Sequence, residues 1–288
     1  MEAALRDLAQ RWRRYWPSSD VAEITRDVEQ RFAAACAHWS LTDPVPLPGG
    51  AVALTCATDD AVLKVLPRLH PDATTMRGEG EALALWSATG AAVELIDDRD
   101  DGMTLLLRRI RPATTLDEAV SDYDEQLVVS GRLVRRLHDA GQPPLALPGI
   151  ESYVQPYRRV LGNDLDRLVD PTVVPVAVHA DLHGGNVLLD DDRWVAIDPK
   201  GVRGDRHLDI WLLVCPQAPP LADEPRAARA EMWRRLNRYA QAAALEPERA
   251  AAWARVVASA ESVLSADSAY SGWPMRLRRI AAALAAPG

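Results

Sequence analysis

Apolar residues near the start of the chain recur three and four positions apart, with arginines between them. This spacing is typical of an amphipathic helix, which we predict over residues 3–16. A second helix is expected over residues 21–38. The apolar positions that define the first helix are Leu5, Leu8, Trp12 and Tyr15.

The pattern changes after residue 45. Between Val45 and Leu66 apolar and polar residues alternate, interrupted by the turn-forming pairs Gly49-Gly50 and Asp59-Asp60. This predicts three short strands joined by tight turns. The elements expected next are a helix over 76–88, a turn over 97–102 and a strand over 103–110.

Helical periodicity dominates the rest of the chain, except for a strand-like and loop-rich stretch over 171–198. The helices expected here span residues 116–138, 225–245, 247–266 and 274–286. We therefore predict an α+β protein with two lobes. Residues 1–110 form a small lobe that contains the strands, and residues 111–288 form a mostly helical lobe. A cleft between two such lobes is the natural place for a ligand.

Composition narrows the class of protein. Of the 288 residues 48% are hydrophobic and 26% are charged, which is typical of a globular protein and disfavours a disordered, collagen-like or coiled-coil chain. The net charge of −8 disfavours nucleic acid as a partner, because that affinity depends on Lys and Arg contacts to phosphates. Three widely spaced cysteines disfavour a disulfide framework. With no signal peptide and no membrane-spanning apolar run, we expect a cytoplasmic protein without membrane partners.

The strongest chemical signal is a His-x-Asp-x-x-x-x-Asn pattern formed by His179, Asp181 and Asn186, with Asp198 twelve residues after the asparagine. A hairpin predicted over 187–197 returns the chain, so that Asp198 faces Asn186. Phosphoryl transfer needs a carboxylate that orients the attacking hydroxyl, and Asp181 fits this role. It also needs oxygen ligands for Mg²⁺ beside the ATP phosphates, and Asn186 and Asp198 supply them.

Lys64 lies inside an apolar predicted strand, where an ammonium group needs an anion. ATP phosphates would serve, and so would a carboxylate of the following helix, which contains both Glu79 and Glu81. Lys64 and Lys200 are the only lysines among 33 basic residues, and this scarcity favours phosphate binding.

The glycines Gly49 and Gly50 would let backbone amides approach phosphates, or they simply form a hairpin turn. The chain contains no Gly-x-x-x-x-Gly-Lys-Ser/Thr pattern and therefore no P-loop. It also lacks a Gly-x-Gly-x-x-Gly pattern between a strand and a helix, so a dinucleotide-binding fold is not supported.

In this order, the Gly-Gly hairpin, the strand lysine, the helix glutamate and the His-x-Asp-x-x-x-x-Asn segment resemble the aminoglycoside phosphotransferases, relatives of protein kinases. Segments 179–186 and 196–200 are most similar to the branch of streptomycin 6-kinases and hydroxyurea phosphotransferases. The resemblance spans about residues 45–212 and implies a bilobal protein-kinase-like fold. It implies an ATP- and Mg²⁺-dependent kinase that phosphorylates a hydroxyl of an aminoglycoside such as streptomycin, and thus antibiotic resistance.

The resemblance also implies roles for single residues. Asp181 is the catalytic carboxylate, Asn186 and Asp198 bind Mg²⁺, His179 supports the loop and Asp209 braces it. Lys64 binds the α- and β-phosphates. Its ion-pair partner is Glu79 as first choice and Glu81 as the alternative.

The strand over 105–110 resembles the connection between the lobes, whose backbone from Arg108 to Ile110 is expected to hold the adenine edge. Relatives often carry glutamate where this chain has Arg108, and the predicted nucleotide loop has few glycines. The choice between ATP and GTP therefore stays open.

The acceptor is expected between the Asp181 loop and the C-terminal helices. A cationic or sugar-like acceptor would favour carboxylates there. The candidates are Asp117, Glu118, Asp122, Asp124, Glu125, Glu261 and Asp267, most of which also fit solvated helix faces. Trp253 and Trp273 would suit a sugar pocket, although tryptophans at helical spacing more often belong to the core.

Three alternatives remain open at this point. The acceptor could be hydroxyurea or another small metabolite. A metal-dependent phosphohydrolase would draw on His138-Asp139, His179, Asp181, His183, His207 and Asp209. A non-catalytic nucleotide-binding protein on the same fold is the third, although every expected catalytic group is present. We expect a monomer or a weak dimer.

Overall fold

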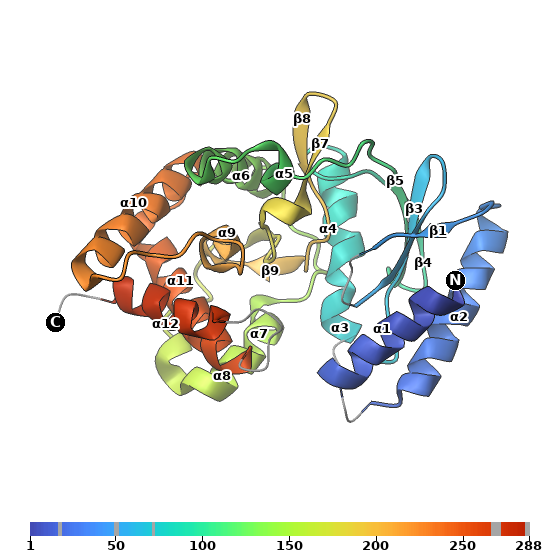
Figure 1. Cartoon of the computed structure of the whole chain (residues 1–288), viewed down its shortest axis with the longest axis horizontal. Coiled ribbons are helices and arrows are strands. Elements are labelled where there is room, and N and C mark those ends of the chain that lie inside the picture. Colours follow the sequence, from blue (N-terminus) through green and yellow to red (C-terminus); the bar gives the residue numbers. More distant parts are fainter. Residues whose placement is uncertain (17–18, 49–51, 71–72, 266–271, 286–288) are drawn as a thin grey trace.

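The computed structural model describes residues 1–16, 19–48, 52–70, 73–265 and 272–285. Its N-terminal part contains a five-stranded antiparallel sheet with the order β1-β2-β3-β5-β4 (Figure 1). The strands are β1 (Val45–Pro46), β2 (Leu54–Ala57), β3 (Ala61–Val65), β4 (Leu95–Arg99) and β5 (Thr104–Arg108). The three strands predicted between residues 45 and 66 are confirmed, whereas Gly49 and Gly50 lie outside the described residues.

Helices cover this sheet on both faces (Figure 1). They are α1 (Glu2–Tyr15), α2 (Val21–His38), α3 (Ala73–Met76) and α4 (Gly78–Ser87). Leu63 and Val65 of β3 join Trp12 of α1 and Val28 of α2 in one buried apolar cluster. Because side chains alternate along a strand, Lys64 points to the opposite face of the sheet, where α4 lies. The alternation of side chains along β3 therefore determines that Lys64 contacts α4 rather than α1 or α2.

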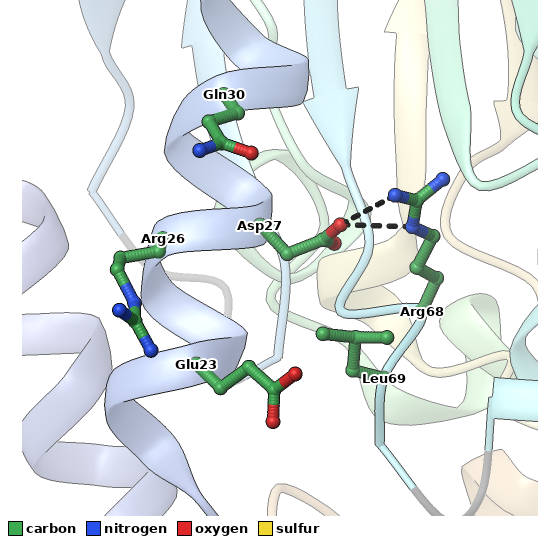
Figure 2. Close-up of a pocket in the computed structure, with 6 residues that line it drawn as sticks. All are labelled: Glu23, Arg26, Asp27, Gln30, Arg68 and Leu69. Atoms are coloured by element: carbon green, nitrogen blue, oxygen red, sulfur yellow. Dashed lines mark hydrogen bonds and ion pairs between the residues drawn. The ribbon is translucent and has the colours of Figure 1, made fainter.

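Buried charges anchor α2 to the sheet. Asp27 accepts a hydrogen bond from Arg31 Nε at 2.9 Å and one from Arg68 Nε at 2.8 Å. Arg31 also donates to Met103 O and Thr104 Oγ1, each at 3.0 Å. Asp27 and Arg68 both line an open cavity of about 410 Å³. Figure 2 shows the two side chains pointing toward each other. This network satisfies a buried guanidinium and carboxylate, and so holds the helix at one position on the sheet.

The C-terminal part is mostly helical (Figure 1). Its helices are α5 (Leu116–Ala119), α6 (Tyr123–His138), α7 (Ile150–Tyr153), α8 (Gln155–Leu161), α9 (Trp211–Val214), α10 (Pro225–Ala243), α11 (Pro247–Leu264) and α12 (Trp273–Ala283). Helix α6 packs along α10, and α11 packs along α12. At Gly131 of α6 the backbones come so close that a Cβ atom would lie 2.9 Å from Tyr239 O of α10. Glycine is needed here for close approach.

Two short antiparallel pairs lie between these parts. Strand β6 (Val176–Val178) pairs with β9 (Val202–Gly204), and β7 (Val187–Asp190) pairs with β8 (Arg193–Ala196). The second pair confirms the predicted hairpin. The end of β8 also joins the N-terminal part, because Ala196 N donates to Ala91 O at 3.0 Å and Val93 N to Ala196 O at 2.9 Å.

Several elements differ from the sequence prediction. The turn expected over 97–102 begins inside β4, an edge strand in which Asp97 and Asp98 are exposed. The single helix expected over 116–138 is two helices. Thr115 and Glu118 form a capping box at α5, and Asp122 caps α6 by accepting a hydrogen bond from Asp124 N at 2.8 Å. These caps favour two separate starts over one continuous helix.

Candidate active site

Lys64 pairs with Glu79 across the space between β3 and α4. Its Nζ atom lies 2.7 Å from both carboxylate oxygens of Glu79, and it also contacts Asp198 Oδ1. The side chains of Lys64 and Glu79 are only 10% and 5% exposed, whereas that of Asp198 is 49% exposed. The structure thus brings Glu79 rather than Glu81 to the lysine. Asp198 lies on the solvent-exposed side of this buried pair.

The electrostatics of this cluster follow from its burial. Burial disfavours the Lys64 ammonium, but the charges of Asp198 and Glu79 outweigh it, so the pKa of Lys64 lies above its usual value. Burial also raises the pKa of Glu79, against the attraction of Lys64. For Asp198 burial acts in the same direction, but Lys64 and Lys200 overcome it and lower the pKa. Lys64 and Asp198 are therefore a charged pair.

Asp209 shapes the loop that carries Asp181. Its carboxylate accepts hydrogen bonds from His179 N at 3.0 Å and Ala180 N at 2.7 Å, and from His138 Nε2 at 2.8 Å. Ala180 has a φ of +59°, a conformation that costs energy for a residue with a Cβ atom. The two amide hydrogen bonds hold that conformation. The structure agrees with the interpretation of Asp209 as the brace of the loop.

His179 lies under the same loop as a neutral ring. Its Nδ1 atom accepts a hydrogen bond from Asp181 N at 3.3 Å, so its Nε2 atom carries the proton and donates to Ile197 O at 3.0 Å. The ring stacks on Trp86, with centroids 6.1 Å apart. Burial lowers the pKa of His179, although Asp209 and Asp181 oppose this. The histidine joins the two segments that carry Asp181 and Asp198.

Asp181 and Asn186 are positioned by the loop and by the hairpin after it. Asn186 Nδ2 donates to Asp181 O at 2.9 Å, which fixes the orientation of the amide, and no described residue donates to its Oδ1 atom. Ile197 N donates to Asn186 O at 3.0 Å and thereby brings Asp198 beside Asn186. One amide oxygen and one half-exposed carboxylate are suitable donors for Mg²⁺. These residues fit the ion that the sequence predicts.

Lys200 approaches Asp181, with Nζ 3.3 Å from Oδ2. Lysine is rare in this sequence, but the sequence alone predicts no role for Lys200. Two features of the sequence could have pointed to a role for Lys200: lysine is scarce, and this lysine lies two residues after Asp198. A second residue without a predicted role is Tyr153, whose hydroxyl donates to Ala180 O at 3.1 Å.

The predicted connection between the lobes lies at the end of β5. Arg108 N donates to Glu94 O and Arg109 N to Asp60 O, each at 2.9 Å, so neither amide is available to a nucleotide. The Arg108 guanidinium binds Asp190 in β7. Ile110 is buried. If adenine binds here, it meets the carbonyl groups or the Ile110 amide.

Three of the candidate acceptor residues have other partners in the structure. Glu118 and Asp122 cap helices, and Asp124 binds Arg234. Asp117 lies against the loop, because a Cβ atom on Gly184 would be 1.7 Å from its Oδ1 atom. The remaining candidates are Glu125, which is exposed, Asp267, which lies outside the described residues, and Glu261.

Glu261 is the second candidate that faces the loop. It accepts a hydrogen bond from the Tyr157 hydroxyl at 2.9 Å and one from the Ser265 hydroxyl at 2.8 Å. Burial raises its pKa, and the charges of Asp181 and Lys200 also act on it. Trp253 and Trp273 are core residues, 0% and 7% exposed, and donate to Asp205 and Val214.

The two-part architecture and the loop between the parts define a kinase-like phosphotransferase fold. A solved choline/ethanolamine kinase family protein from Mesorhizobium loti has a TM-score of 0.62 at 16% identity, with 92% of this chain and 96% of that chain covered. The streptomycin–ATP ternary complex of APH(2″)-IIa has a TM-score of 0.51 at 10% identity, with 86% and 94% covered. The predicted protein-kinase-like fold is confirmed.

The family model for aminoglycoside/hydroxyurea antibiotic resistance kinases matches residues 38–269, and the chain belongs to this family. The streptomycin 6-kinase of Streptomyces griseus is 32% identical over 148 residues, covering 45% of this chain and 47% of that protein. The streptomycin 6-kinase of Streptomyces glaucescens is 29% identical over 241 residues, covering 75% and 76%. The matched region thus spans about half of the first relative and three quarters of the second. The predicted family and class, a phosphotransferase with an alcohol acceptor, are confirmed.

This membership disfavours the alternative of a metal-dependent phosphohydrolase. Its candidate ligands have other partners, since His138 binds Asp209 and His207 Nδ1 lies 2.7 Å from Asp205. In the part of the chain that the structure describes, no group of three or more His, Cys, Asp or Glu residues could hold a metal ion. No helix among the described residues is long and apolar enough to cross a membrane.

Proposed function

We propose that this protein transfers the γ-phosphoryl group of ATP to a hydroxyl group of streptomycin, with Mg²⁺ as cofactor. The observation that carries the proposal is the convergence of Lys64, Glu79, Asp181, Asn186 and Asp198 on one site from two parts of the chain. Streptomycin is the acceptor in the names of both Streptomyces relatives. Streptomycin carries guanidinium groups, which favour carboxylates such as Asp117 and Glu261 beside the loop.

Each residue has a distinct task in this reaction. Asp181 accepts the proton of the attacking hydroxyl and orients its oxygen. Asn186 and Asp198 would hold Mg²⁺, which neutralises charge on the phosphates when it is bound. Lys64, fixed by Glu79, binds the α- and β-phosphates once a nucleotide draws it from Asp198. The acceptor oxygen forms a bond to phosphorus as the bond to the β-phosphate oxygen breaks, and ADP leaves.

The nucleotide is proposed to bind beneath the sheet, with its base at the end of β5. The backbone from Arg108 to Ile110 is proposed to offer carbonyl groups to the base. This arrangement does not distinguish adenine from guanine through a side chain, so the test must compare ATP with GTP.

The proposal is tested by mass spectrometry of acceptors after incubation with the protein, Mg²⁺ and either ATP or GTP. The panel contains streptomycin, other aminoglycosides, hydroxyurea and simple amino sugars. We expect streptomycin to gain one phosphoryl group and the other compounds to react far more slowly. Phosphorylation of a different acceptor would overturn the choice of streptomycin, and no product from any acceptor despite nucleotide binding would overturn the whole assignment of substrates.

A further inference from the structure

Lys200 is a charged residue beside the candidate active site that has no task in the reaction described above. Its Nζ atom lies 3.3 Å from Asp181 Oδ2, and its side chain is 50% exposed whereas that of Asp181 is 18% exposed. It is one of only two lysines in the chain, and the other, Lys64, already binds Glu79 and Asp198. The ammonium of Lys200 is therefore a half-exposed cation, and among the described residues Asp181 is the one carboxylate within ion-pair distance of it.

The backbone of Lys200 is held from two sides. Its amide donates to His179 O at 2.9 Å, which ties it to the catalytic loop. On the other side, a Cβ atom on Gly78 would lie 2.5 Å from Lys200 O and 2.1 Å from Gly201 O, so this backbone packs directly on the first turn of α4. The position of Lys200 is thus fixed relative to both Asp181 and Glu79, and only its flexible side chain can move.

The charges around the ammonium show where an anion would be bound. A lysine side chain is a cation at neutral pH, and the Nζ atom of Lys200 lies 3.3 Å from Asp181 Oδ2. In phosphoryl transfer the γ-phosphoryl group lies between the attacking oxygen and the metal that bridges the β- and γ-phosphates. Asp181 is proposed to lie at the attacking oxygen and Asp198 at the metal, and Lys200, two residues after Asp198, contacts Asp181.

We propose that Lys200 is a further catalytic residue, whose ammonium group leaves Asp181 when ATP binds and then contacts the γ-phosphoryl group. This inference rests on the proposed kinase function. In the nucleotide-free protein Lys200 neutralises Asp181. During transfer it stabilises the charge on the phosphoryl oxygens while the acceptor oxygen bonds to phosphorus and the hydroxyl proton passes to the freed Asp181 carboxylate. Lys64 would then contact the α- and β-phosphates, and Lys200 would contact the γ-phosphoryl group that is transferred.

The first test measures binding and needs no acceptor. Isothermal titration calorimetry with Mg²⁺ compares ADP with a non-hydrolysable ATP analogue in the wild type, Lys200→Met and Lys200→Arg. We expect Lys200→Met to lose about tenfold in affinity for the analogue, as for a charge-assisted hydrogen bond, with ADP affinity within about twofold of the wild type. Lys64→Met is the comparison variant, and it weakens both nucleotides because it removes the contact to the α- and β-phosphates.

The second test separates catalysis from structure. For Lys200→Met we expect kcat to fall by about a hundredfold or more while the KM of the acceptor stays within a few-fold, and Lys200→Arg to restore part of kcat. Thermal melting of each variant checks that it is folded. Equal losses of ADP and analogue affinity in Lys200→Met, or a kcat close to the wild type, would overturn the proposal. If the wild type phosphorylates no acceptor, the proposed function fails, whereas the affinity ratio still decides whether Lys200 contacts the γ-phosphate.

Discussion

Single buried side chains hold the loop that carries Asp181 in a conformation that its backbone alone would not favour. The Asp209 carboxylate accepts hydrogen bonds from the amides of His179 and Ala180. Ala180, directly before Asp181, has a positive φ. The neutral His179 ring then connects Asp181 N to Ile197 O, one residue before Asp198. At this scale the site depends on the hydrogen-bonding state of one carboxylate and one imidazole.

The protonation of His179 should appear in the pH dependence of stability. Its pKa is lowered by burial from 6.5 in the folded state, so its contribution is complete above about pH 6.5 and is lost as pH falls toward the folded-state pKa. We expect the melting temperature of the wild type to fall between pH 7 and pH 5. Differential scanning calorimetry should show a lower but flatter profile for His179→Gln.

The exposed histidine His38 provides the matched control, and His38→Gln should follow the wild-type profile. A His179→Gln profile that runs parallel to the wild type from pH 7 to pH 5 would contradict the assignment of a neutral buried ring.

Asp198 should govern the effect of Mg²⁺ on nucleotide binding. We expect Asp198→Ala to bind ATP with the same affinity in Mg²⁺ and in EDTA, because the carboxylate that holds the ion is gone. The control is Asp192→Ala, which removes an exposed carboxylate in the turn between β7 and β8. Calorimetry that shows unchanged Mg²⁺-dependent affinity in Asp198→Ala would contradict its role as a metal ligand.

At the scale of elements, the first turn of α4 and the segment after Asp198 are fitted to each other through two glycines. Gly201 has a φ of +64°, and a Cβ atom on it would lie 1.9 Å from Gly78 O. This contact sets the distance between the helix that carries Glu79 and the segment that carries Asp198 and Lys200. Neither backbone can move away without disturbing the ion pairs of Lys64.

A methyl group at Gly201 should therefore destabilise the fold and the site together. We expect Gly201→Ala to lower the free energy of unfolding by about 3 kcal/mol, from backbone strain and overpacking, and to lower the melting temperature by about 6–12 °C. Gly90→Ala is the matched control, because Gly90 also has a positive φ, +61°, but its nearest neighbour is the flexible Arg193 side chain at 3.4 Å. Equal losses in the two variants would contradict a specific close contact at Gly201.

The sequence predicted elements well where their patterns are regular. Apolar spacing located α1, α2 and the long C-terminal helices, and alternation located β2 and β3. It did not predict β4, because an exposed edge strand containing Asp97 and Asp98 has no apolar alternation. It also missed short helices such as α7 and α9, in which one turn of chain gives too few positions to define a period.

At the scale of the whole molecule, the site is assembled from segments far apart in the chain. The sequence named Lys64, Glu79, Asp181, Asn186 and Asp198 because each belongs to a motif with a definite chemical need. It could not assign a partner to Lys200, because the 3.3 Å approach to Asp181 depends on how the loop and the segment after Asp198 pack. The order of the motifs therefore predicts which residues form the site. The contacts between them, such as that of Lys200 with Asp181, depend on tertiary packing.

Connections between the two parts also lie beyond sequence patterns. Arg108 of β5 binds Asp190 of β7, and the segment after α4 exchanges backbone hydrogen bonds with Ala196 of β8. These contacts hold the sheet against the hairpin of β7 and β8. The boundary between the lobes near residue 110 stays a prediction. Residues before it, such as Arg108, contact residues after it, such as Asp190.

The central claim is that Asp181 accepts the proton of a streptomycin hydroxyl as that hydroxyl receives the phosphoryl group of ATP. The most direct test is a single-turnover measurement with excess protein, Mg²⁺, radiolabelled ATP and streptomycin, for the wild type and Asp181→Asn. We predict that the wild type transfers one label per streptomycin, and that Asp181→Asn binds Mg-ATP normally but reacts about a thousandfold more slowly. A rate for Asp181→Asn close to that of the wild type would contradict the account.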